Sequence, residues 1–349
     1  MRNSFELALD HLGRKIGGLP VEVIYEDDQQ KPDVGKQKTE KLIESDKVDF
    51  VVGYIWSNVL LASLKPVLDA QTFLISANAG PSQIAGELCS PFFFSTSWQN
   101  DQTPQAMGDY MNQKGVKTAF LIGPNYAAGK DMLAGVQATF KGQRDRRGAD
   151  QVAGAARLLR RAVEGARGAS PMRCSCSIRA PPACSSSTQY AQAGLKGQIP
   201  LYTAFTIDAI VAAAAEGPRA RRSRRPAMGQ RPAQRRQQEI RRRLPRQAQD
   251  LRRRSTARSP TTPSASSTAR SWRSTATSPR RTACATEMRK ANYASVRGPY
   301  KYGNNHFPIQ NFYLQDVVKD ADGNLTLKTV ATIVKDSQDQ FHDKCPMKW

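Results

Sequence analysis

Two Arg-rich blocks limit most strongly what this chain can fold into. Residues 143–187 hold 9 Arg and 3 acidic residues, and residues 217–286 hold 20 Arg and 2 acidic residues. Neither block contains a Lys, and the stretch 269–286 has no helical or strand-like apolar period. The folded core is therefore expected to come from the other three segments, residues 1–142, 188–216 and 287–349.

The charge of the chain belongs to these blocks. The whole chain has a formal net charge of +22, whereas the two blocks alone carry +24, so the remainder is slightly acidic. A strongly basic chain usually indicates a nucleic-acid or membrane-surface partner. The runs RRSRR and RRRLPR, however, have no interleaved aromatic residues and no recognisable nucleic-acid-binding module around them. We expect no specific nucleic-acid partner.

The composition of the blocks favours out-of-frame translation. Lys and Arg serve phosphate contacts almost equally as charges, so 29 Arg without one Lys is improbable for a selected basic patch. Reading Pro171–Ser187 in a shifted frame with GC-rich codons can give DAVFVFYPGAAGVQFL, a buried strand, a turn and a helix start. The alternative is a genuine disordered, basic insert that binds nucleic acid, or a product without function.

The remaining sequence alternates helical and strand patterns. Strands are predicted at VEVIYED, VDFVVG, TFLIS and KTAFLIG, with VDFVVG fully buried. A first helix is predicted near the N-terminus, because Phe5, Ala8, Leu9 and Leu12 have the helical spacing of an apolar face. Further helices are predicted at DVGKQKTEKLIES, SNVLLASLKPVLDA, TPQAMGDYMNQKG and AAGKDMLAGVQATFKG. Alternating elements with continuous apolar strands predict an α/β fold built on doubly wound parallel sheets.

In such sheets, ligands bind beyond the carboxyl ends of the strands. Three loops lie there: GYIWSN, SANAGPS and GPNYAAG. Ser57 and Asn58 begin a helix, whose free N–H groups could bind a carboxylate. The alternative is that Ser57 is only a helix cap and SANAG only a tight turn.

The sequence contains no recognisable catalytic or metal-binding motif. No nucleophile elbow, Walker loop, GxGxxG or HExxH is present, so we expect no catalytic residue, no cofactor and no enzyme activity. Cys174, Cys176 and Cys184 lie in one Arg-rich block and Cys284 lies in the other, which leaves Cys89 and Cys345 outside the blocks. The histidines are scattered at His11, His306 and His342, so no metal site is expected.

Several stretches resemble the leucine/isoleucine/valine-binding family of solute receptors for ABC importers. They are VVGYIWSNVLLA, FLISANAGPSQIAG, CSPFFFSTSWQNDQ, FLIGPNYAAGKDM, QYAQAGLKGQIPLY and RGPYKYGNNHFPIQNFYLQDV, and they are most similar to the branch that handles aromatic acids. The resemblance covers about two thirds of the chain. It implies the type I periplasmic binding protein fold, two lobes joined by a hinge, which closes on a ligand and delivers it to membrane permease subunits.

The resemblance also assigns ligand contacts. Those that would hold a ligand carboxylate are Tyr54, Trp56, Ser57, Ser76, Asn78, Ala79 and Gly80, and those in the second lobe are Tyr126, Phe205 and Asp208. Trp98 is expected to pack at the hinge. The ligand is expected to be a small carboxylate or an amino acid, although the acidic partner that an ammonium group needs falls in an Arg-rich block. An amidase-control sensor on the same fold is a further alternative.

The implied lobes are residues 1–100 with about 228–306, and 101–227 with 307–349. Family members begin with a strand and a glycine-containing ligand loop that this sequence lacks, so the N-terminal strand is expected to be missing and to leave an unpaired sheet edge. The family is periplasmic, whereas MRNSFELALDH is too polar for a secretory signal. A periplasmic setting would permit Cys89 and Cys345 to pair.

Overall fold

The fold was analysed in a computed structural model of the chain. The structure describes residues 2–145, 173–176, 200–204, 278–291, 295, 298–321 and 323–348. The chain divides into two compact units, residues 1–27 with 224–288 and residues 28–223 with 289–349. Each unit is described by itself.

The first unit contains short elements. They are α1 (Arg2–His11), the two-residue strands β1 (Lys15–Ile16) and β2 (Leu19–Pro20), and most of α12 (Ser278–Arg289). Leu7 and Leu9 are the buried residues of α1, while Ala8 and Leu12 are exposed. The predicted apolar face is therefore wrong in part, because α1 ends at His11 and leaves Leu12 beyond it.

The strand predicted at VEVIYED is absent. Residues 21–28 have no regular secondary structure, and β1 and β2 pair only with each other. A strand is stabilised by a neighbour that satisfies its backbone groups. No described strand lies beside residues 21–28, which explains why the apolar alternation there does not produce a strand.

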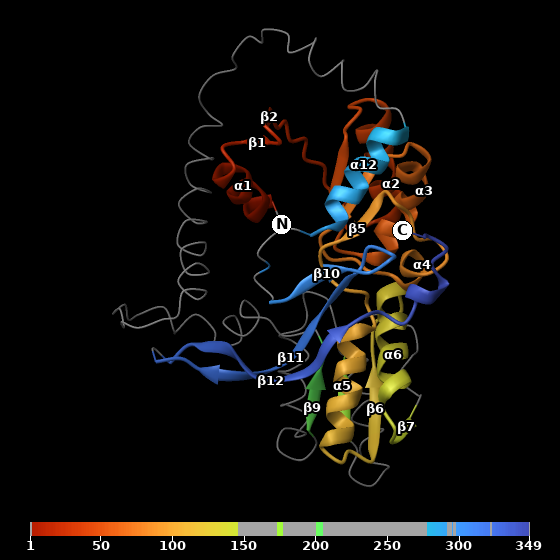
Figure 1. The fold of residues 1–349 in the computed structure, drawn as a ribbon. Coiled ribbons are helices and arrows are strands. Elements are labelled where there is room, and N and C mark those ends of the chain that lie inside the picture. The colour runs from red at the N-terminus through yellow and green to blue at the C-terminus, as the bar shows by residue number, and fades with distance from the viewer. Residues whose placement is uncertain are drawn as a thin grey trace. The chain divides into compact units, whose positions relative to one another are not determined.

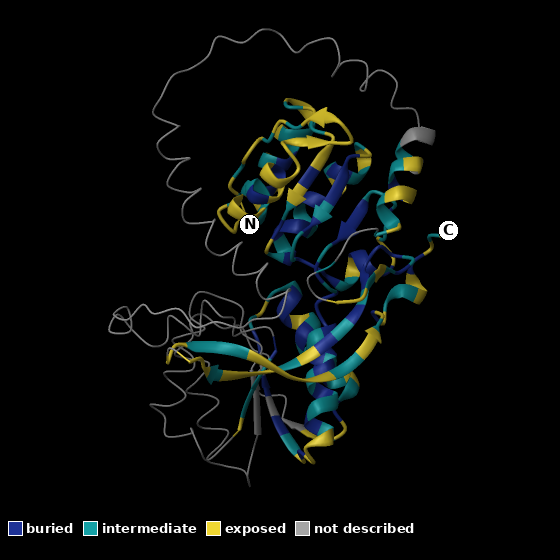
Figure 2. Cartoon of the chain, turned by 60° about the vertical axis from the view of Figure 1, so that its left-hand side comes forward, coloured by how far each residue is buried: buried dark blue, intermediate teal, exposed yellow. Residues whose placement is uncertain are grey.

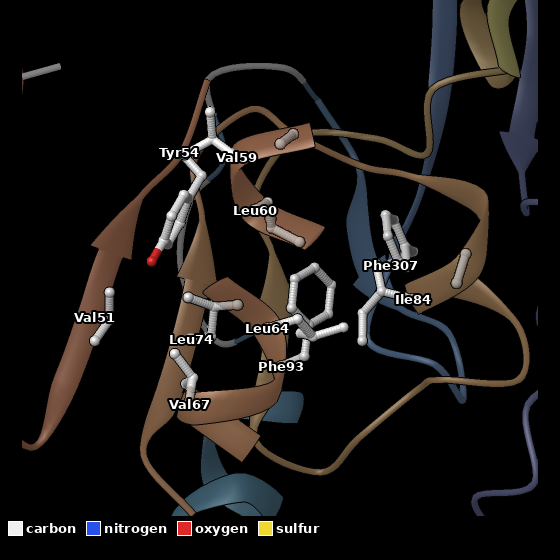
Figure 3. Packing of buried hydrophobic residues seen from close by; sticks show 12 residues of the cluster. Val51, Tyr54, Val59, Leu60, Leu64, Val67, Leu74, Ile84, Phe93 and Phe307 are labelled. Atoms are coloured by element: carbon white, nitrogen blue, oxygen red, sulfur yellow. The ribbon is translucent and has the colours of Figure 1, made fainter. Parts of the chain in front are cut away.

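The second unit contains two parallel sheets (Figure 1). The first has the order β3-β4-β5. Its strands are β3 (Phe50–Gly53), β4 (Phe73–Ser76) and β5 (Phe93–Ser95), and its helices are α2 (Pro32–Glu44), α3 (Ser57–Asp69) and α4 (Ser82–Ala85). Leu60 and Leu64 of α3 pack with Leu74 of β4 and Phe93 of β5 in one core cluster, to which Phe307 adds its ring (Figure 3). These elements agree with the predicted α/β alternation.

The first strand, β3, is buried on one side only. Val51 is 6% exposed, whereas Phe50 and Val52 are both 44% exposed. The prediction of a fully buried strand is therefore wrong. β3 lies at the edge of its sheet, and its alternate side chains point to opposite faces. Only the face that carries Val51 packs into the core cluster with Leu60 and Leu64 of α3.

The second sheet has the order β7-β6-β8-β9, again all parallel. Its strands are β6 (Thr118–Ile122), β7 (Gln143–Asp145), β8 (Arg173–Cys176) and β9 (Leu201–Thr203), and its described helices are α5 (Gln102–Gln113) and α6 (Ala127–Thr139). Met111, Ala119, Val136 and Phe140 form its core. Both β7 and β8 belong to the Arg-rich block 143–187, so part of that block pairs as strand through its backbone.

The C-terminal part is antiparallel. It consists of β10 (Tyr300–Tyr302), β11 (Pro308–Lys319), β12 (Leu325–Ser337) and the 3-10 helix η2 (His342–Lys344), with the strand order β10-β11-β12. The second half of β11 and the middle of β12 are largely exposed (Figure 2). In the part of the chain that the structure describes, no helix is both long and apolar enough to cross a membrane.

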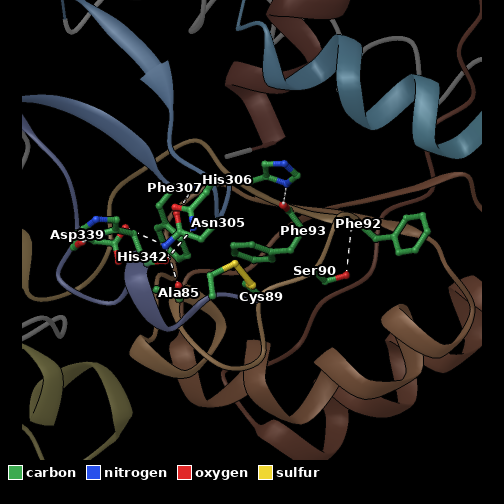
Figure 4. Close-up of a disulfide and its surroundings, with 12 residues drawn as sticks. Ala85, Cys89, Ser90, Phe92, Phe93, Asn305, His306, Phe307, Asp339 and His342 are labelled. Atoms are coloured by element: carbon green, nitrogen blue, oxygen red, sulfur yellow. Dashed lines mark hydrogen bonds between the residues drawn. A yellow bond between two sulfur atoms is a disulfide. The ribbon is translucent and has the colours of Figure 1, made fainter. Parts of the chain in front are cut away.

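A disulfide joins Cys89 to Cys345 and fixes the C-terminal segment on the first sheet (Figure 4). Asn305 supports the same junction, because its Nδ2 donates to the Ala85 carbonyl at 2.7 Å and to Asp339 Oδ2 at 2.9 Å. The C-terminal segment therefore returns to the first sheet after the β11–β12 ribbon. The predicted lobe boundaries stay a prediction.

Candidate functional site

Two of the three predicted loops are joined into one structure. Because β3 and β4 are parallel neighbours, the loops that follow them start side by side. The Asn78 side chain donates from Nδ2 to the Ile55 carbonyl at 2.8 Å. The N–H groups of Ala77 and Ala79 donate to the carbonyls of Gly53 and Tyr54 at 2.8 and 3.1 Å. The two loops therefore form a hydrogen-bonded platform at the carboxyl end of the first sheet.

The second loop, SANAGPS, is fixed by a hydrogen bond within it and by contacts with the segment that follows β5. Ser76 is fully buried, and its Oγ donates to the Ala79 carbonyl at 2.5 Å. Gly80 donates its N–H to Asn100 Oδ1 at 3.2 Å. A Cβ added to Gly80 would lie 2.1 Å from the Trp98 carbonyl oxygen, so the close approach of these two backbones requires glycine. Trp98 thus contacts this loop from the segment that leads to the second sheet.

The helix α3 starts at this platform. Trp56 is its N-cap residue and makes no side-chain cap, so α3 begins at Ser57 as the sequence predicts. The N–H groups of a first helical turn have no partner within the helix, and they carry the positive end of the helix dipole. Ser57 is buried, and its Oγ accepts from Asn100 Nδ2 at 3.1 Å. Its hydroxyl is thus engaged within the protein, while the helix start can receive an anion.

The start of α6 lies opposite. Tyr126 is the N-cap residue of α6, at the end of the loop that follows β6. Its ring centroid lies 5.6 Å from that of Trp56, with the ring planes tilted by 58°. Two predicted ligand residues are thereby in contact, although they lie in loops that follow strands of different parallel sheets. Residues from both sheets meet at the carboxyl ends of their strands, where α/β proteins bind ligands.

Tyr54 takes a different position. Its φ of +58° is in the left-handed region and turns the chain sharply after β3. Its side chain lies in the core of the first sheet (Figure 3), and its hydroxyl is 2.5 Å from Thr39 Oγ1 of α2. Burial raises the pKa of this phenol. The side chain thus supports the loop from beneath, and only the main chain of Tyr54 belongs to the platform.

The remaining two predicted contacts, Phe205 and Asp208, lie outside the described residues. The last described residue before them is Ala204, which is buried directly after β9. β9 is parallel to β8, which is itself parallel to β6, so the carboxyl end of β9 lies at the same edge of the sheet as the carboxyl end of β6. Their assignment to the ligand stays a prediction.

A buried polar network near the platform was not predicted. Asp131 of α6 accepts hydrogen bonds from Ser82 and Asn100, and Asn100 also contacts Ser57 and Gly80. Burial raises the pKa of the Asp131 carboxyl. The signal in the sequence is the run Gln99–Gln102, four consecutive polar residues directly before a predicted helix. In the structure all four are at most 8% exposed.

The described residues contain no group of His, Cys, Asp or Glu side chains placed to hold a metal. The Asp131 carboxylate beside the platform is bound by Ser82 and Asn100. The hydroxyls of Ser57 and Ser76 bond to a side-chain amide and a main-chain carbonyl, not to a histidine. The arrangement is suited to hold a ligand by hydrogen bonds and ring contacts.

A family model described as a periplasmic binding protein matches residues 1–324 of the chain. This chain belongs to the periplasmic binding protein family. The match confirms the resemblance to the receptors for leucine, isoleucine and valine, and the type I fold that it implied. Periplasmic binding proteins of this kind are solute-binding proteins of transporters and are not enzymes. A comparison with curated protein sequences gives no match.

Solved structures share the fold of this periplasmic binding protein. An ABC transporter solute-binding protein from R. palustris in complex with benzoate has a TM-score of 0.75 and 24% identity, covering 99% of this chain and 94% of its own. A solute-binding protein from Rhodopseudomonas palustris BisB5 with 3,4-dihydroxybenzoic acid gives 0.73 and 19%, covering 97% and 93%. A branched-chain amino-acid transporter protein from Streptococcus pneumoniae with isoleucine gives 0.66 and 15%, covering 94% and 93%.

Proposed function

We propose that this protein is the solute receptor of an ABC importer, which captures a small carboxylate between its two parallel-sheet lobes and delivers it to permease subunits in the membrane. The observation that carries the proposal is the contact between Trp56 and Tyr126 at the starts of α3 and α6. A ligand held there would touch both sheets, so binding would be coupled to closure of the lobes. A periplasmic location follows from the same proposal.

The carboxylate would bind at the start of α3. Its first-turn N–H groups donate hydrogen bonds and add the positive end of the helix dipole. The platform of the two joined loops fixes these donors in place, which lowers the entropy lost on binding. Ser57 and Asn78 would contribute through their position at this platform. Ala79 and Gly80, whose N–H groups bond to Tyr54 and Asn100, would fix its shape.

An aromatic acid is the ligand class that the described groups favour. The rings of Trp56 and Tyr126 offer apolar faces, which suit an aromatic ring. The loops GYIWSN, SANAGPS and GPNYAAG contain no acidic residue. The ammonium group of an amino acid would therefore find no anionic partner in these three loops, and losing its hydration without one is costly. Similar structures contain benzoate, 3,4-dihydroxybenzoate and isoleucine, so both classes belong in the test.

A thermal-shift measurement on the full chain tests this function. We expect millimolar benzoate to raise the melting temperature, because a ligand at 100 times its Kd adds about 2.7 kcal/mol to the free energy of unfolding. Benzamide, which has the same shape without the charge, should give little shift. Isoleucine should give less than benzoate. Equal shifts with benzoate and benzamide, or none with any carboxylate, would refute the proposal.

A Trp56→Ala variant localises the effect. Loss of the indole removes one ring face from the ligand and should reduce the benzoate-induced shift by at least half. Phe50→Ala is the matched control, because Phe50 is an exposed aromatic residue on β3 away from the loops. It should leave the shift unchanged.

A further inference from the structure

The carboxylate of Asp131 joins helices that belong to different sheets. Asp131 lies on α6 of the second sheet, and Ser82 is the first residue of α4 beside the first sheet. The Ser82 N–H donates to Asp131 Oδ2 at 3.0 Å, and the Ser82 hydroxyl donates to Oδ1 at 2.8 Å. Asn100 Nδ2 donates to Oδ2 at 2.9 Å. Both carboxylate oxygens are thus occupied by donors from outside the second sheet.

The same network reaches the proposed ligand platform. Asn100 donates from Nδ2 to Ser57 Oγ at 3.1 Å, and its Oδ1 accepts from the N–H of Gly80. One amide side chain therefore contacts the start of α3, the second ligand loop and the carboxylate on α6. Movement of α6 away from the first sheet would break the contacts of Asp131 with Ser82 and Asn100 while leaving the platform itself intact.

Asp131 lies on α6 between a tight backbone contact at one end and the Tyr126–Trp56 ring contact at the other. Gly135 lies one turn further along α6 and packs tightly on the segment between β5 and α5. A Cβ added to Gly135 would lie 2.4 Å from the Asp101 carbonyl oxygen. Tyr126 lies at the other end, where its ring meets Trp56. Rotation of α6 about the close contact at Gly135 would separate Tyr126 from Trp56 most, and Asp131 lies between the two.

We propose that Asp131 is a latch that holds the two parallel-sheet lobes closed through Ser82 and Asn100, a positioning role that rests on the proposed receptor function. The latch bonds are made within the protein and do not use the groups assigned to the ligand. Asn100 also bonds to Ser57 and Gly80, which are assigned to the ligand, whereas Ser82 does not. The two bonds from Ser82 to Asp131 are therefore expected to be equally strong with and without ligand. Weakening them should ease opening of the free and of the liganded protein to the same extent.

Equal easing of opening in the free and the liganded protein would have a measurable effect on the binding rates. If opening becomes easier in both states, ligand enters and leaves faster by similar factors, while the Kd changes little. A residue that merely shapes the binding site would instead raise the dissociation rate alone. Asp131→Asn tests the difference, since it keeps the shape but replaces one acceptor oxygen by a donor that faces the existing donors.

Stopped-flow tryptophan fluorescence with benzoate on the full chain measures both rates. For Asp131→Asn we expect the association and dissociation rates each to rise about tenfold, with the Kd within about threefold of wild type. Ser82→Ala, which removes only the hydroxyl donor, should change both rates in the same direction by a smaller factor. Asp109→Asn on α5 is the control and should change neither. A rise in the dissociation rate alone, or no change, would overturn the latch.

Hydrogen exchange without ligand separates this inference from the proposed function. Asp131→Asn should speed exchange in the peptides that contain residues 54–60 and 124–130, because these helix starts separate when the lobes open. Exchange in β4 should not change. If benzoate gives no signal with wild type, the receptor function fails, yet the exchange result still decides the latch. Unchanged exchange in both peptides would refute it.

Discussion

The pKa of the Asp101 carboxyl is set by its buried surroundings. Its side chain is 1% exposed and bonds to the Gln340 side chain, which joins the segment after β5 to the segment after β12. Burial, with smaller contributions from the carboxylates of Asp131 and Asp339, raises the pKa of Asp101 to about 7. The folded protein therefore favours the protonated form of this group below about pH 7.

This shift predicts a pH-dependent stability. Because the folded pKa of Asp101 lies above its unfolded value, its contribution is fully present below about pH 4 and is lost as the pH rises to about 7. The free energy of unfolding should fall by up to about 4 kcal/mol over this range. Asp101→Asn should remove most of the slope, measured by urea denaturation between pH 4.5 and 7.5. Asp69→Asn, exposed on α3, should keep it, and an equal slope in the Asp101 variant would contradict the account.

At the same scale, the sequence predicted which loops meet but not where each side chain points. Gly80 and the helix start at Ser57 follow from turn chemistry and helix signals, which are local. The inward side chain of Tyr54 depends on its positive φ and on Thr39, a residue on another helix. The bonds of Asn100 to Ser57 and Asp131 span 43 and 31 residues, so no local pattern carries them.

At the scale of elements, β3 provides a direct test of the sheet's orientation. Val51→Ala should lower the free energy of unfolding by about 1.5 to 3 kcal/mol, because the buried side chain leaves a space in the core. Val52→Ala is the matched control on the same strand and should cost about 0.5 kcal/mol or less, because its side chain is largely exposed. Urea denaturation of both variants gives the comparison. Equal losses would show that the two faces of β3 are equally covered.

Elements were predictable where their pattern is local and their partners are present. Continuous apolar runs gave β4 and β6, and helical periodicity gave α2, α3, α5 and α6. The run VEVIYED also has a strand-like pattern, an alternation of apolar residues, but no described strand lies beside it, so its propensity alone does not form a strand. The strand β8 was not predictable from Arg173–Cys176, because its place in the sheet comes from backbone pairing with β6 and β9.

At the scale of the whole molecule, the disulfide Cys89–Cys345 closes a very long loop, with a sequence separation of 256 residues. A cross-link of this kind restricts the unfolded chain and fixes the C-terminal segment on the first sheet. Replacing both cysteines by serine should lower the free energy of unfolding by about 2 to 5 kcal/mol. Denaturation of wild type with reductant should reproduce the loss. Full stability of the double variant would contradict a stabilising role for the cross-link.

Ligand capture at the contact between the two sheets is the central function proposed for this protein. Isothermal titration calorimetry of the full chain with benzoate, for wild type and Tyr126→Ala, tests it most directly. Tyr126 and the start of α3 lie on different sheets, so a ligand that bridges them should bind wild type with one site and the variant at least tenfold more weakly. Tyr313→Ala, an exposed control on β11 of the same unit, should bind like wild type. No binding heat in a protein that remains folded, or equal affinity for Tyr126→Ala, would contradict the account.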